Sequence, residues 1–159
     1  MSPVVRANWI LAVTAVILAL FQLRTPMETA VRHPPLTPLE PERIQSIRIE
    51  TDGRLVEHLE RRREGWFSRM QQTAVTDETW VERLLHMAEL PSLTRFPVPR
   101  DPTPYGLDRP RHRLWFDGLE LQWGGVEPIS GRRYVRVGDT VHLVTDGYTH
   151  HLHPARNHP

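Results

Sequence analysis

Cysteine and lysine are both absent from this sequence of 159 residues. Without cysteine the chain has no disulfide, no thiolate nucleophile and no zinc site built on thiolates. Its 20 basic residues are therefore all arginine, and with 19 acidic residues they give a formal net charge of +1. Nucleic-acid-binding proteins depend on a strong positive field, which this balance does not supply. We expect no nucleic-acid partner.

The short signatures of common catalytic sites are missing as well. The sequence has no GxxxxGK phosphate loop, no HExxH, no GxSxG and no CxxC. The acidic residues could supply an acid–base pair, but no spacing singles out two of them. We expect a protein that is not an enzyme and that carries no cofactor.

Histidine is concentrated at the C-terminal end, at His150, His151, His153 and His158. Neutral imidazoles bind Zn²⁺, Cu²⁺ or Ni²⁺, but a specific site also needs a rigid scaffold and supporting partners. A terminal segment flanked by proline is typical of a flexible tail. We therefore predict no physiological metal site there.

One long apolar segment is present near the N-terminus. Trp9–Phe21 contains no charge, and a helix over Pro3–Leu23 would be roughly 31 Å long, about the hydrocarbon thickness of a bilayer. A cleaved signal peptide needs small residues at its cleavage site, where Glu28 fits poorly. A buried core helix normally shows a polar face, and this segment has none. We predict an uncleaved, single-pass membrane anchor over residues 1–25.

Composition then divides the rest of the chain into three parts. Residues 26–42 are rich in proline and read as an extended, semi-rigid spacer. Residues 43–149 carry the patterning of one globular domain, and residues 150–159 form the His-rich tail. At this size the domain can bury a single core.

Alternation and turn signals predict the elements of that domain. Ile47 and Ile49 alternate with charged residues, and a hairpin turn at Asp52-Gly53 leads to a partner strand. A further turn at Glu64-Gly65 leads into Trp66-Phe67. Two more strand pairs, Arg113–Phe116 with Leu119–Trp123 and Tyr134–Val137 with Val141–Thr145, are joined through Asp117-Gly118 and Gly138-Asp139.

One amphipathic helix is predicted between these hairpins. Apolar residues recur at helical spacing from Trp80 to Leu90, Thr76 or Asp77 can cap its start, and Pro91 ends it. The sequence thus predicts an α+β fold: an N-terminal transmembrane helix, then one domain with antiparallel β hairpins packed on an amphipathic helix.

A loop and one aromatic residue are the candidate interaction or structural site. The loop residues are Tyr105, Gly106, Leu107, Asp108 and Pro110. As a structural corner, glycine takes positive φ, leucine fills the core, aspartate bonds the turn backbone and proline fixes the approach to a strand. The same segment could instead be a binding loop, and both interpretations stay open.

Trp115 is the aromatic candidate. It lies on the strand face opposite Leu114 and Phe116, so we expect it to be exposed. Arg109, Arg111 and Arg113 would alternate on one face if this strand began early, and such a face could meet lipid phosphates. Arg61-Arg62-Arg63 is expected to be a solvated hairpin end.

Four short motifs resemble the domain-of-unknown-function 4340 family. They are LTPLEPERIQSIRIE at 36–50, Gly65-Trp66, YGLDRP at 105–110 and GRRYVRVGDTVHLV at 131–144. The resemblance implies a membrane-anchored, extracytoplasmic domain, encoded beside ABC-transporter components like those of gliding-motility systems. No catalytic residues are established for the family, so none is carried over.

The resemblance therefore implies a single-pass protein of the bacterial inner membrane, with a periplasmic C-terminal domain. We expect it to act by protein–protein interaction, with ABC transporter subunits as the partners that the resemblance implies. Two alternatives stay open: a periplasmic module that binds a sugar or peptide through Trp115 and the 97–110 loop, and an enzyme with dispersed carboxylates.

Overall fold

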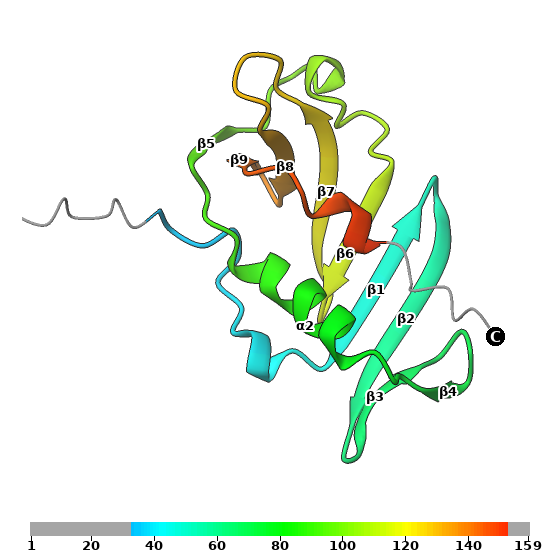
Figure 1. The fold of residues 1–159 in the computed structure, drawn as a ribbon. Helices are drawn as coiled ribbons and strands as arrows, with labels where there is room; N and C mark the ends of the chain where they lie inside the picture. The colour runs from blue at the N-terminus through cyan, green and yellow to red at the C-terminus, as the bar shows by residue number, and fades with distance from the viewer. Residues whose placement is uncertain (1–32, 153–159) are drawn as a thin grey trace, which may run out of the picture. The chain divides into compact units, whose positions relative to one another are not determined.

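The computed structural model describes residues 33–152, which form one large sheet and one α-helix (Figure 1). The strands are β1 (Ser46–Thr51), β2 (Arg54–Arg62), β3 (Gly65–Ser68), β4 (Thr73–Ala74), β5 (Thr94–Pro97), β6 (His112–Phe116), β7 (Leu119–Val126), β8 (Arg133–Val137) and β9 (Thr140–Val144). The helices are α2 (Glu78–His86) and the 3-10 turns η1 (Pro41–Arg43), η2 (Met87–Glu89), η3 (Thr103–Tyr105) and η4 (Thr149–Leu152).

The nine strands form one antiparallel sheet in the order β4-β3-β2-β1-β6-β7-β8-β9-β5. The three hairpins predicted from turn residues, β1–β2, β6–β7 and β8–β9, are confirmed. At the β6–β7 turn, Asp117 (φ 47°) and Gly118 (φ 92°) both have positive φ, the conformation that two-residue hairpins require. Pairing of β1 with β6 joins the N-terminal and C-terminal hairpins into one sheet.

The predicted helix is also confirmed, as α2 followed by η2. Asp77 caps it, since its carboxylate accepts a hydrogen bond from the Trp80 backbone N–H at 2.9 Å. The helix buries Trp80, Val81, Leu84 and Leu85. The coarse α+β prediction therefore holds for the described residues.

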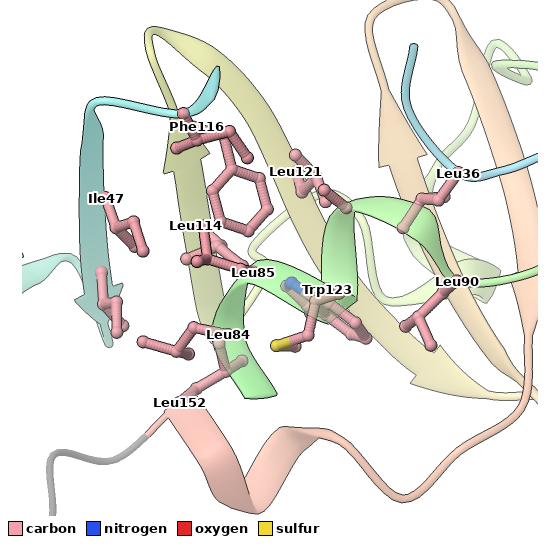
Figure 2. Close-up of a cluster of buried hydrophobic side chains, with 14 of the residues drawn as sticks. Leu36, Ile47, Leu84, Leu85, Leu90, Leu114, Phe116, Leu121, Trp123 and Leu152 are labelled. Carbon is pink, nitrogen blue, oxygen red and sulfur yellow. The ribbon is translucent and has the colours of Figure 1, made fainter. Parts of the chain in front are cut away.

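The helix covers one side of the sheet, here called the inner face. Figure 2 shows Leu84 and Leu85 of α2 packed over Leu114, Phe116, Leu121 and Trp123 of β6 and β7. Ile47, Ile49 and Leu59 extend this cluster across β1 and β2, and each is fully buried. The opposite side of the sheet is called the outer face.

The packed domain begins earlier than the predicted boundary at residue 43. Leu36 is buried, and its N–H donates to the Leu90 carbonyl at 2.8 Å. The Ser92 N–H donates to the Pro34 carbonyl at 2.9 Å, around a bridge between Pro35 and Pro91. Proline lacks an N–H but keeps its carbonyl, so this part of the proline-rich stretch pairs with the domain instead of acting as a spacer.

The domain also extends beyond the predicted boundary at residue 149. Leu152 in η4 is fully buried in the core, as Figure 2 shows. The His151 carbonyl accepts a hydrogen bond from the Trp80 indole N–H at 2.8 Å. The start of the predicted tail is therefore part of the fold, because its one leucine supplies apolar area to the core.

The predicted membrane anchor over residues 1–25 lies outside the described residues, as do residues 26–32 and the tail from residue 153. Between residues 33 and 152, none of the helices has the length and apolar character needed to cross a bilayer.

Candidate functional site

The loop of residues 105–108 forms a corner whose backbone lies directly against the backbone of β7. Gly106 has a φ of 64°, and a Cβ there would come within 2.8 Å of the Gly125 nitrogen. A Cβ on Gly124 would come within 2.4 Å of the Tyr105 carbonyl oxygen. Neither position has room for a side chain, so glycine is required on both sides of the contact. These contacts support the corner interpretation.

The other loop residues divide between buried and exposed positions. Leu107 and Pro110 are buried, as expected of a corner, although Leu107 lies outside the main core cluster. Asp108 is exposed, and the described part of the chain gives its side chain no hydrogen-bonding partner. The turn bond predicted for it is made by Asp101 instead, whose carboxylate accepts from the Thr103 N–H at 3.0 Å. Hydrogen bonding from the Thr103 side chain and from its backbone N–H lowers the pKa of Asp101.

Tyr105 belongs to an aromatic cluster at the β5 end of the outer face. Its ring centroid lies 5.0 Å from that of Tyr134 and 5.5 Å from that of Phe96. Burial, with Glu127 and Tyr105 nearby, raises the pKa of the Tyr134 hydroxyl. Phe96 comes from β5, a strand that sequence patterning did not reveal. The cluster fixes the corner to the sheet through ring packing.

Trp115 lies on the outer face, as predicted from its position between Leu114 and Phe116. Its direct cross-strand neighbours are Arg48 on β1 and Glu120 on β7. The Arg48 guanidinium carbon lies 4.4 Å from the ring centroid, so the cation stacks on the indole. Trp115 itself is half-buried, and Arg48 is exposed.

Arg48, Trp115 and Glu120 thus form one cross-strand row on the outer face, and a second row runs beside it. From β1 to β9 its members are Glu50, Arg113, Gln122, Arg136 and Val141. Arg113 pairs with Glu120 at 3.7 Å, which links the two rows. Glu120, Gln122 and Arg136 also line a hollow of about 170 Å³. The outer face thus presents aromatic, cationic and amide groups held in fixed register by the sheet.

The structure does not combine Trp115 with the 97–110 loop into one pocket. A cavity of about 390 Å³ lies beside the loop, lined by Gly106, Arg109, Arg111, His112, Trp123, Gly124, Gly125, Arg133 and Thr149. His112 and Trp123 are inner-face residues of β6 and β7, whereas Trp115 points to the outer face. The three arginines expected to alternate are also separated, because Arg113 lies on the outer face and Arg109 and Arg111 line this cavity.

The arginine-rich end of the β2–β3 hairpin is more ordered than expected. Arg61 donates to the carbonyls of Glu42 at 2.7 Å and Pro41 at 3.3 Å, and its guanidinium stacks on Trp66. Arg62 stacks on Phe67 with 3.4 Å between the guanidinium carbon and the ring centroid. Arg61 is therefore a packed side chain and not a solvated one.

Buried ionisable groups are held by structural partners. Glu57 is fully buried and accepts hydrogen bonds from the Ser68 hydroxyl at 2.7 Å and the His58 N–H at 2.8 Å. His142 is buried, and its Nδ1 lies 2.8 Å from the Ser92 hydroxyl. Burial, with a smaller contribution from Arg95, lowers the pKa of His142.

No group of three or more metal-ligating side chains gathers anywhere between residues 33 and 152. Of the C-terminal histidines, His150 and His151 have ring centroids 3.7 Å apart, and His153 and His158 lie outside the described residues. Desolvation, with His150 and Arg83 nearby, lowers the pKa of His151.

Comparison with known proteins identifies no relative: the chain matches no protein-family model, no curated protein and no solved structure.

Proposed function

We propose that this protein is a membrane-anchored, non-enzymatic domain that binds a partner protein through the outer face of its sheet. The observation that carries the proposal is the stacked pair of Arg48 and Trp115, presented on rigid strands and partly exposed to solvent. Arginine and tryptophan are the residue types most enriched at the energetic centres of protein interfaces.

The surroundings of this pair suit an interface. Glu120 lies directly opposite Trp115 on the neighbouring strand, and Glu120, Gln122 and Arg136 border a hollow of about 170 Å³ on the same face. An aromatic centre with a polar rim is the usual arrangement of a recognition surface. Strand pairing fixes these groups before any partner arrives, which lowers the entropy cost of binding.

The proposed cellular location and the proposed partner of this protein are inferred from its sequence. The apolar segment before residue 25 supports a single-pass anchor in the bacterial inner membrane with the domain in the periplasm. The resemblance of four short motifs to the domain-of-unknown-function 4340 family supports a subunit of an ABC-type transport or envelope complex as the partner.

The alternative of a sugar or peptide module receives less support. It required Trp115 and the 97–110 loop to act together, but the cavity beside the loop is lined by other residues. An aromatic platform for sugar would have to use Trp115 alone, and its ring face already carries Arg48.

The test is a pull-down of the full-length protein from its own membranes in mild detergent, with mass spectrometry of the bound proteins. We expect transporter subunits in stoichiometric amounts, lost from the double variant Arg48→Ala/Trp115→Ala. The matched control is Met70→Ala, since Met70 is 50% exposed but lies in the β3–β4 turn. Equal recovery of the partner by both variants would exclude the outer face as the binding surface.

A further inference from the structure

The cavity beside the 106–112 segment is lined by positively charged side chains. Three of its lining side chains are arginines, Arg109, Arg111 and Arg133, and none of the described residues that line it is acidic. His112, Trp123, Thr149 and three glycines complete the wall. Its volume of about 390 Å³ lies within the range of small-molecule sites.

The three arginines differ in how far they are already paired. Arg133 is committed to structure, because it forms a bidentate ion pair with Asp146 at 2.8 and 3.0 Å and donates to the Gly124 carbonyl at 2.7 Å. Arg111 pairs loosely with Asp52 at 3.5 Å, and both side chains are largely exposed. Within residues 33–152, Arg109 has no carboxylate at ion-pairing distance. Two cations thus remain available to a ligand.

The backbone around the cavity is fixed in place. A Cβ on Gly106 would lie 2.8 Å from the Gly125 nitrogen, and one on Gly124 would lie 2.4 Å from the Tyr105 carbonyl oxygen, so neither glycine can carry a side chain. Arg133 on β8 donates a hydrogen bond to the Gly124 carbonyl on β7, so the backbone of Gly124 is held both by this bond and by the contact with Tyr105. Binding a ligand here would require only the two exposed arginine side chains to become ordered.

We propose that this cavity binds the phosphate group of a small ligand, with Arg109 and Arg111 as the two guanidinium donors. A guanidinium presents donors in a planar fork that matches phosphate and carboxylate oxygens. Arg109 has no carboxylate at ion-pairing distance among the described residues, and Arg111 has only the loose, exposed contact with Asp52. With no acidic side chain in the wall, these two cations complement a dianion better than a monoanion, which favours phosphate over carboxylate. The cavities beside the arginine-rich hairpin are less suited, because Glu64 lines one and Glu78 and Glu82 line the other.

The experiment is calorimetric titration of the full-length protein in a neutral detergent at low salt, with inorganic phosphate, glycerol 3-phosphate and acetate as separate probes. Low salt is used because dissolved ions would screen the attraction between these exposed arginines and the anion. We expect a phosphate probe to bind more tightly than acetate, and the double variant Arg109→Gln/Arg111→Gln to weaken that binding at least tenfold. Tighter binding of glycerol 3-phosphate than of phosphate would point to a phosphomonoester or lipid headgroup, and equal binding to free phosphate.

The matched control is Arg100→Gln/Arg132→Gln, two exposed arginines that do not line the cavity. We expect it to bind phosphate like the unchanged protein. The proposal is overturned if no phosphate probe binds, if acetate binds more tightly, or if both double variants lose binding equally. Because none of these residues belongs to the outer face, the outcome is independent of the protein-interaction proposal.

Discussion

The two faces of the sheet are built by alternate residues of the same strands, yet one face stabilises the fold and the other is exposed to partners. On β6, His112, Leu114 and Phe116 point inward and are buried, while Arg113 and Trp115 point outward and are half-buried. Of these inner side chains, Leu114 and Phe116 belong to the apolar core under α2, so they determine stability. The outer ones are charged or aromatic and pair with each other across strands, so their residue types are free to serve recognition. Recognition is therefore expected on the face that the core does not need.

Substitution of neighbouring residues on β6 should separate the two faces most clearly. We expect Leu114→Ala to lower the free energy of unfolding by about 3 kcal/mol, because it opens a cavity in the core. Trp115→Ala should cost only about 1 kcal/mol despite the larger side chain removed, since it is half-exposed. Urea unfolding followed by circular dichroism measures both, and equal losses would contradict the division.

The corner at the end of the sheet offers a second matched pair. We expect Gly124→Ala to cost about 2 kcal/mol, because its Cβ would lie 2.4 Å from the Tyr105 carbonyl oxygen and backbone cannot easily yield. Gly125→Ala should change stability by less than about 0.5 kcal/mol, since its Cβ would lie no closer than 3.5 Å to any neighbour. Thermal unfolding of the two variants tests the corner interpretation directly, which fails if Gly124→Ala is tolerated.

The inner face should also give the protein a pH dependence near neutrality. Burial lowers the pKa of His142 in the folded state, so the unfolded chain binds the proton first as the pH falls below about 6.5. Stability is therefore retained above that pH and lost as the pH falls toward the folded pKa. Urea unfolding at several pH values between about 5 and 7.5 should show this slope, and His142→Gln should flatten it. A slope of the same size in the variant would assign the effect to another group.

The smallest effect is expected for the Arg48–Trp115 stack. Cation–π pairs at exposed sites contribute about 0.5 kcal/mol, so a double-mutant cycle of Arg48→Ala and Trp115→Ala should give a coupling energy of that size. A coupling above about 2 kcal/mol would show that the outer face is part of the stability of the domain. A small coupling energy, together with loss of partner binding by the variants, would show that the Arg48–Trp115 pair serves recognition.

Local signals in the sequence predicted the elements well. Asp52-Gly53 and Asp117-Gly118 fixed two hairpins because both central residues of such turns need positive φ, which this dipeptide accepts readily. Asp77 before an apolar repeat predicted the helix start for an equally local reason. The position of Trp115 on the outer face followed from the period of two along a strand.

Edges and boundaries were harder to predict. β5 is a short edge strand that ends in proline, and its pairing with β9 becomes visible only in the sheet. Leu36 and Leu152 lie in segments whose composition resembles a spacer and a tail, yet both are buried. Composition reports the average character of a segment, whereas one well-placed leucine is enough to dock it.

The sequence alone determined where the strands turn, where the helix begins, which strand residues alternate and which classes of catalytic chemistry have no motif. Only the tertiary structure decided which residues meet: Arg48 under Trp115, Gly106 against Gly125, and Arg109 with Arg111 around one cavity. The physical reason is that turns and caps depend on neighbours in sequence, while these contacts depend on strand register and loop packing between distant segments. A shift of one residue in the β1–β6 pairing would reverse both faces.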